Sequence, residues 1–471
     1  MKHKFLLNLS ANTLQLIVNQ LCGFAVFYLL STQLSKANFG LLNLVLAILL
    51  ISFNLLTLGI DQVIIKKIAG GYNLQKLLSL YLFHVLLTGF LFYTMLLLAI
   101  QLLAANHALY LLLLVIGTGK LLIYFSSPFK TLANGLEKFK LLAIMLVVSN
   151  LARSVGLLIL LAFRQITLTE TIIAFVTGDL LELLVCTYLF KRQLKIPVLF
   201  NWDKKAYIEL LSEALPQTGV VILTAIMARF DWIFIGIFIS ALKLAEYSFA
   251  YKIFEISSLP LLAIAPLLLP WFTKLIKTGL SFTEKFKTLV NIELIIASIT
   301  MLTLNLLWEP VVDFVTAGKY GAVNSKTIFI LSCAIPFLYL NNFFWTLNFA
   351  QGRTKMILKG FMLTFSINAS LDIMLIPFFG NEGAALALLI SSMAQTYFYF
   401  TQNEIDALNS IWRKLIIYIG CTFFAGFTAI MCFSNPYLLL SFALLLYFLL
   451  MLVMGQLKIS NYLAFLKTNL K

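Results

Sequence analysis

The chain has 471 residues, of which 61% are hydrophobic and only 11% are charged, and its mean hydropathy is +0.98. Because soluble domains average about 25% charged residues, this composition excludes an ordinary soluble protein and indicates an integral membrane protein. The net charge of +15 would suit a nucleic-acid-binding protein, but its distribution along the chain argues against that class.

A helix needs about 20 apolar residues to cross a bilayer. On this criterion the first half of the chain contains predicted spans at 12–31, 41–60, 77–103, 108–128, 141–162 and 169–190. The second half contains predicted spans at 213–240, 245–270, 289–307, 327–349, 360–378, 383–401, 415–433 and 437–456. The first apolar run lacks a small-residue cleavage site, so we expect a retained helix and not a signal peptide.

Basic residues are distributed very unevenly between the two sides of these spans. With the N-terminus placed inside, most of the 34 lysines and arginines fall on the cytoplasmic side, and the outer loops hold only Lys36, Arg164, Lys243, Lys319 and Lys326. This positive-inside pattern predicts a multi-pass membrane protein with both termini in the cytoplasm. The basic excess then reflects topology and contact with anionic lipid headgroups.

Two short patterns recur in the two halves of the chain, as is typical of transporters. The turn Leu34–Phe39 resembles Leu242–Tyr247, and Ala133–Lys138 resembles Ala350–Lys355. These matches predict an all-α membrane fold of about 14 transmembrane helices, with two six-helix bundles in pseudo-twofold repeat. The predicted domains are an N-terminal bundle, a C-terminal bundle and an extra helix pair with a cytoplasmic tail, at residues 1–195, 196–405 and 406–471.

One hairpin of two apolar spans, residues 212–274, carries Arg229, Asp231, Lys252 and Glu255. An ionised side chain at bilayer depth costs about 2.5–3.5 kcal/mol, so we expect these groups to face a wet or protein-lined interior. The second helix of the hairpin also contains residues that bend helices, namely Pro260, Pro266 and Pro270. The hairpin therefore has the features of a moving and binding part of a transporter.

Segments spread over nearly the whole chain resemble one family of membrane proteins. They are Leu34–Leu41, Gly59–Asp61, Arg229–Asp231, Glu246–Lys252, Asn368–Pro377 and Gly380–Ala385. In these segments the chain resembles the polysaccharide-exporter branch of the multidrug/oligosaccharidyl-lipid/polysaccharide (MOP) superfamily, the Wzx-type O-antigen flippases. It departs from that pattern at Phe39, where relatives have tyrosine, and at Gln62, where relatives often have arginine.

The resemblance implies a flippase that moves an oligosaccharide joined by pyrophosphate to a polyprenol, an O-antigen or capsule repeat unit, by alternating access. The implied partners are this lipid-linked substrate, membrane lipids and the glycosyltransferase and polymerase machinery, with the flippase itself a monomer and no nucleic acid bound. No catalytic constellation, cofactor or metal motif is visible. Gly117–Lys120 lacks the spacing of a phosphate loop, which leaves an ion gradient or consumption of the product as the energy source.

The candidates for binding the diphosphate are the basic residues within predicted spans: Lys120, Arg153, Arg229 and Lys252. The alternative is that each of them pairs with a carboxylate and holds helices together. The candidates for coupling to an ion or proton are acidic residues at similar depth: Asp179, Asp231, Glu255 and Asp372. Lys252 and Glu255 are three residues apart and are expected to pair, whereas Arg229 and Asp231 lie nearly opposite each other on a helix. His84 is expected to bond to neighbouring helices in preference to relaying protons.

Two other functions compete with the flippase. An ion-coupled multidrug exporter of the MATE type would have twelve helices and a cavity lined by acidic and aromatic residues. A membrane glycan polymerase or ligase would carry its working residues on a large outer loop. The largest predicted outer loop, Trp308–Lys326, is modest, so we rank the polymerase lowest.

Overall fold

The computed structural model describes residues 2–99, 106–163, 166–198, 202–261, 268, 272, 283–403 and 411–457. In this part of the chain, all regular secondary structure is helical. Within these described ranges, thirteen helical segments are long and apolar enough to cross a membrane. The predicted class, an all-α integral membrane protein, is confirmed.

Thirteen of the predicted spans each correspond to one of these helical segments. The remaining predicted span, 245–270, begins as α9 (Ala241–Ser257). Much of its second half, with Pro266 and Pro270, lies outside the described residues.

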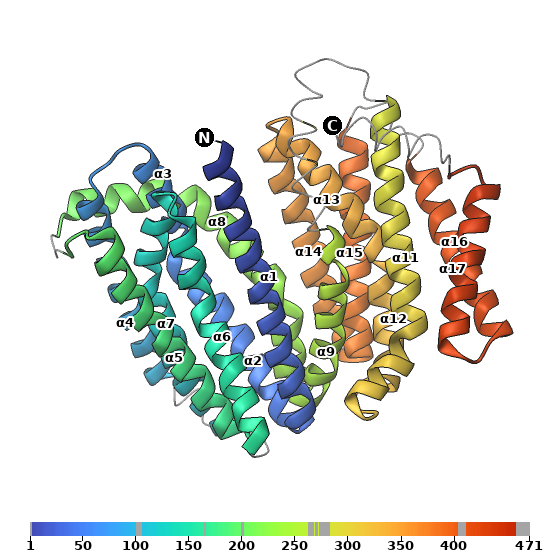
Figure 1. Ribbon diagram of the computed structural model, residues 1–471, viewed down its shortest axis with the longest axis horizontal. Helices are drawn as coiled ribbons and strands as arrows, with labels where there is room; N and C mark the ends of the chain where they lie inside the picture. Colours follow the sequence, from blue (N-terminus) through green and yellow to red (C-terminus); the bar gives the residue numbers. More distant parts are fainter. Residues whose placement is uncertain are drawn as a thin grey trace. The chain divides into compact units, whose positions relative to one another are not determined.

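The chain divides into two compact units, Met1–Gly236 and Ile237–Lys471, which are described separately. The first unit contains α5, α6 and α7 packed on one another, α1 along α6, and α8 against α2 and α3 (Figure 1). Its helices are α1 (Lys2–Gln33), α2 (Lys36–Thr57), α3 (Ile60–Ala69), α4 (Leu74–Leu98), α5 (His107–Gly135), α6 (Phe139–Phe163), α7 (Leu168–Leu189), the π-helical turn η2 (Phe190–Leu194) and α8 (Lys204–Phe234). A second π-helical turn, η3 (Ile235–Ile239), follows α8.

In the second unit, α14 packs on α15, α16 packs on α17, and α11 packs against α13 and α16. Its helices after α9 are α11 (Thr283–Thr316), the 3₁₀ turn η4 (Ala322–Asn324), α12 (Ser325–Cys333), α13 (Ile335–Ala350), α14 (Thr354–Phe379), α15 (Asn381–Gln402), α16 (Ile411–Cys432) and α17 (Pro436–Val453). The η4, α12 and α13 segments together make one span, Ala322–Ala350.

The first compact unit ends at Gly236, whereas the predicted N-terminal bundle ends at residue 195. The difference arises because α8 packs on α2 and α3, which assigns α8 to the first unit by contact. Repeat boundaries and packing boundaries are different properties of a chain. The bundle boundaries at 195 and 405 therefore stay a prediction.

Short polar side chains determine where several helices begin. At the start of α2, the hydroxyl of Ser35 accepts a hydrogen bond from the Asn38 N–H at 3.2 Å. At the start of α7, Thr167 and Glu170 exchange hydrogen bonds in a capping box. These contacts satisfy N–H groups that have no partner within the first turn of a helix.

Two helices run well beyond their predicted C-terminal ends. Helix α5 continues beyond residue 128 to Gly135, with Pro128 inside it. A membrane helix tolerates the hydrogen bond that proline removes where its surface remains packed, and Phe129 and Leu132 beyond the proline are buried. Helix α11 likewise passes Pro310 and ends at Thr316.

The predicted outer loop Trp308–Lys326 is consequently shorter than expected, because its first half belongs to α11. The connection that remains is held by Asp313, whose carboxylate accepts the N–H groups of Gly321 and Ala322 at 2.7 and 3.1 Å. The Trp308 indole N–H donates to the Gly321 carbonyl at 2.9 Å. A compact, internally bonded turn of this kind leaves little room for the working loop of a polymerase.

Candidate functional site

Five charged side chains from α5, α6 and α7 form a group in the first unit that we call the charged cluster. Its members are Lys120, Lys130, Arg153, Asp179 and Glu182. The Arg153 guanidinium donates to the fully buried Asp179 carboxylate. The Lys130 ammonium lies 2.7 Å from Glu182 Oε1. Because three cations face two carboxylates, the cluster has an excess of positive charge.

Two glycines allow the helices that carry this cluster to approach closely. A Cβ atom at Gly119 of α5 would lie 2.6 Å from Asp179 Oδ2. A Cβ atom at Gly178 of α7 would lie 2.9 Å from Arg153 Cγ. Small residues at helix contacts are the usual means of close packing in membranes. Here they also make space for a buried ion pair.

The ion pair of Arg153 and Asp179 is enclosed but does not use all of its hydrogen-bonding capacity. Ser149 Oγ donates to Asp179 Oδ1 at 3.3 Å, and the Phe175 ring centroid lies 4.6 Å from the guanidinium carbon. Arg153 Nε and Asp179 Oδ2 are buried without a hydrogen-bond partner among the described residues. Arg153 therefore retains a donor for a further acceptor.

Lys120 differs from the other cations of the cluster. It is half-buried and within electrostatic reach of Arg153, Lys130 and Glu182. Across the described ranges it has no ion-pair or hydrogen-bond partner, whereas Arg153 and Lys130 each have a carboxylate. An uncompensated ammonium inside a membrane protein is costly, so this position favours an anionic ligand.

Sequence reasoning placed Lys130 in a cytoplasmic loop, because it ended the helix at Pro128. The structure places Lys130 inside α5, with 12% of its side chain exposed. The signal that could have found it is Gly135, a typical residue at the end of a helix.

Sequence reasoning also missed Glu293 of α11, although it lies in a predicted span. It is fully buried, and neither carboxylate oxygen has a hydrogen-bond partner in the described part of the chain.

On α8, Arg229 and Asp231 are half-buried and make local contacts. Arg229 Nη1 donates to the Ala228 carbonyl at 2.7 Å, and its guanidinium carbon lies 4.3 Å from the Trp232 ring centroid. Asp231 Oδ1 accepts the Trp232 N–H at 2.9 Å. Their roles in binding and coupling stay predictions.

In the second unit, Lys252 Nζ lies 2.8 Å from Glu255 Oε2, which confirms the pairing predicted from their spacing. Asp372 is fully buried within α14.

In the first unit, His84 contacts Tyr207 Oη at 3.0 Å and the Leu56 carbonyl at 2.8 Å. The expected helix-bridging role of His84 is therefore confirmed. In the described ranges, no three His, Cys, Asp or Glu side chains converge as metal ligands.

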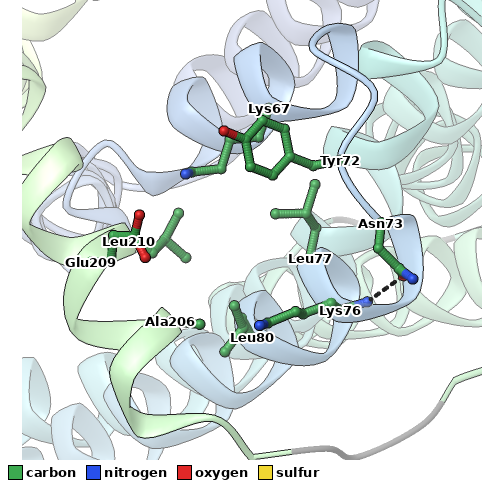
Figure 2. A pocket seen from close by; sticks show the side chains of 9 residues that line it. All are labelled: Lys67, Tyr72, Asn73, Lys76, Leu77, Leu80, Ala206, Glu209 and Leu210. Atoms are coloured by element: carbon green, nitrogen blue, oxygen red, sulfur yellow. Dashed lines mark hydrogen bonds between the residues drawn. The ribbon is translucent and has the colours of Figure 1, made fainter.

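A pocket of about 170 Å³ lies between the α3–α4 connection and α8 (Figure 2). Its two lysines are compensated by carboxylates: Lys67 Nζ lies 2.8 Å from Glu213, and Lys76 Nζ lies 2.8 Å from Asp203. The Ala206 backbone N–H and then Lys76 hold the pKa of Asp203 below its usual range. We call this feature the α8 pocket. Because the positive charge of the α8 pocket is compensated, the pocket has little electrostatic attraction for an anion.

The arrangement of helices is shared with solved transporters of the MOP superfamily. The chain matches "Lipid II flippase MurJ, inward closed conformation" over 94% of its length and 98% of that chain, with a TM-score of 0.75 and 15% identity. It matches an inward-facing multidrug resistance MATE family transporter over 84% of its length and 96% of that chain, with a TM-score of 0.62 and 14% identity. A MOP superfamily transporter from Pyrococcus furiosus, described as having a binding pocket of reverse polarity, matches over 85% and 94%, with a TM-score of 0.56 and 13% identity.

The protein is therefore a multi-pass membrane protein with the fold of a MOP-superfamily transporter. Residues 5–276, more than half of the chain, match the family described as "Polysaccharide biosynthesis protein". The chain belongs to this family. Among curated proteins, none matches it. Both the family and the fold agree with the resemblance seen in the sequence.

Proposed function

We propose that the protein is a flippase that carries a polyprenyl-diphosphate-linked oligosaccharide across the bacterial inner membrane by alternating access. The family and the MOP fold support transport connected with polysaccharide synthesis. The observation that carries the proposal is Lys120, an ammonium group within a membrane span that has no carboxylate partner among the described residues. A lipid-linked diphosphate is an anion that can reach such a position while its tail remains in lipid.

In this proposal the diphosphate of the substrate is bound by cationic side chains. The diphosphate lies against Lys120 and accepts from the donor of Arg153 that Asp179 leaves unused. Charge-assisted hydrogen bonds of this kind are about twice as strong as neutral ones. Arg229 and Lys252 are proposed as further cationic contacts. Asp179, Asp231, Glu255 and Asp372 are proposed as the candidates for coupling transport to an ion or proton.

The positive charge of the cluster opposes the competing function of a multidrug exporter. Such exporters of organic cations need an acidic or aromatic lining, because like charges repel. With Lys130 and Arg153 neutralised by Glu182 and Asp179, Lys120 would repel a cationic substrate. The charge of the cluster thus favours an anionic cargo.

The test is transport by the purified full-length protein in liposomes that contain a fluorescent polyprenyl-diphosphate oligosaccharide and no ATP. Flipping is read as the fraction of fluorophore that a membrane-impermeant reductant can reach. We expect Lys120→Gln to slow flipping about tenfold or more, because a charged hydrogen bond contributes about 1.5–3 kcal/mol. Lys120→Arg keeps the charge and retains most of the rate.

Arg229→Ala and Arg229→Lys provide a second matched pair in the same assay. We expect Ala to impair flipping and Lys to preserve part of it, since the charge remains but the bidentate contact is lost. Equal rates for Lys120→Gln and the wild type would remove Lys120 from the site. Efflux of a cationic dye without flipping of the lipid would establish the multidrug alternative.

A further inference from the structure

A second pocket, of about 410 Å³, lies in the second unit, where the α13–α14 connection meets the end of α15. We call it the α14 pocket. Three of its lining residues are basic, and the rest are polar, small or apolar: Arg353, Lys355 and Lys359, with Gly352, Thr354, Met356, Phe398 and Gln402. None of these lining residues is acidic.

The charge of the α14 pocket is uncompensated within the described residues. Arg353, Lys355 and Lys359 are exposed, and none of them forms an ion pair with a described carboxylate. In the α8 pocket, by contrast, both lysines have a carboxylate 2.8 Å away. Helix α14 also begins at Thr354, so the partial positive charge of its N-terminus adds to the same location. Of the two pockets, only this one retains its attraction for an anion.

Aromatic residues beside the α14 pocket favour a position at the level of the lipid headgroups. Tyr397 and Phe400 of α15 lie 6.4 and 5.6 Å from the Trp412 ring, measured between centroids. Tryptophan and tyrosine gather at the boundary between hydrocarbon and water. Phe398, which lies between these two residues in the sequence of α15, lines the pocket. The pocket therefore offers cations to the headgroup layer and an apolar wall to the hydrocarbon below it.

We propose that the α14 pocket holds the phosphate headgroup of an anionic membrane phospholipid. Basic pockets between membrane helices are suited to headgroup phosphates. Phe398 and Met356 would contact the first carbons of the acyl chains. A soluble phosphate would use the cations but leave this apolar wall without a partner. This lipid stays in place, and its binding does not depend on the flippase proposed above.

The test is native mass spectrometry of the full-length protein released from nanodiscs of phosphatidylglycerol mixed with phosphatidylcholine. The variant Arg353→Gln/Lys355→Gln/Lys359→Gln is expected to retain about tenfold less phosphatidylglycerol than the wild type, with retention of phosphatidylcholine unchanged. The matched control is Lys191→Gln/Lys204→Gln/Lys205→Gln, which removes the same charge from exposed residues that do not line either pocket. It is expected to behave as the wild type.

Equal retention by the pocket variant and the wild type would overturn the proposal. An equal loss in both triple variants would also overturn it, because the effect would then be general surface charge. Inorganic pyrophosphate added to the wild type provides the third arm. If it displaces the phospholipid and binds without it, the site is one for soluble phosphate. If it fails to displace the phospholipid, the lipid assignment is supported.

Discussion

Among single residues, Arg153 and Asp179 show that a buried ion pair can be costly to break while adding little net stability. Removing two charges from water is expensive, and the attraction between them recovers that cost only when both are present. The pair is nearly fully enclosed, with 8% of the Arg153 side chain and none of the Asp179 side chain exposed. Its net contribution to stability is therefore small, but the loss of one partner leaves an isolated charge inside the bundle.

We expect Arg153→Leu and Asp179→Leu each to destabilise the protein by about 3–5 kcal/mol, and the double variant to recover most of that loss. The unfolding midpoints of these variants in detergent micelles measure the loss of stability and its recovery. The control is the Lys252–Glu255 pair, whose side chains are 20% and 43% exposed. Its double glutamine variant should change stability by about 1 kcal/mol or less, because solvent screens the pair. Additive losses in the Arg153/Asp179 double variant would contradict the ion pair.

Among the helices, α8 shows how the entry to a membrane segment is fixed. Its described membrane span begins at Val221, so the first turns after Asp203 precede the span. Asp203 caps the helix by accepting the Ala206 N–H at 3.0 Å and pairs with Lys76 of α4. Glu213 pairs with Lys67 of α3. These contacts join the start of α8 to two neighbouring helices of the first unit.

The pKa of Asp203 is lowered, so its contribution to stability is fully present above the pKa of the unfolded chain, about 3.9. That contribution is lost as the pH falls through the lower folded pKa. We expect Asp203→Asn, which keeps a capping oxygen without the charge, to unfold with a weaker dependence on pH below about 4. Asp203→Ala should be less stable than Asp203→Asn at neutral pH. If the acid-unfolding curves of the wild type and Asp203→Asn are parallel, the charge of Asp203 does not contribute to the pH dependence of stability.

For the molecule as a whole, the distribution of basic residues defines a topology that can be measured directly. The positive-inside rule places Lys140 in the cytoplasm and Lys326 outside. Both side chains are exposed in the structure, so a cysteine at either position is accessible to a reagent. Of the native cysteines, Cys432 is exposed and should be replaced first.

In a Cys432→Ser background, we expect Lys326→Cys to react with a membrane-impermeant maleimide in intact cells. Lys140→Cys should react only after the membrane is permeabilised. The reverse pattern would invert the topology and place both termini outside. Labelling of both positions in intact cells would show that the assumed number of crossings between them is wrong.

Local chemistry determined much of what could be predicted. Hydropathy alone located thirteen of the spans that the structure describes. The i,i+3 spacing alone predicted the ion pair of Lys252 with Glu255, because neighbours on one helix face meet wherever that helix lies. Short segments spread over the sequence likewise indicated the resemblance to the polysaccharide exporters, which the family match confirmed.

The tertiary structure alone decided which charges meet between helices. Arg153 reaches Asp179 across 26 residues, and Lys130 reaches Glu182 across 52. The rotation of each helix decides such pairings. In helices that are apolar all round, no hydrophobic stripe marks the buried face, because lipid is as apolar as a protein core. For the same reason the sequence proposed Lys120 and Arg153 as equivalent cations, and only packing distinguished the paired arginine from the lysine without a carboxylate partner in the described chain.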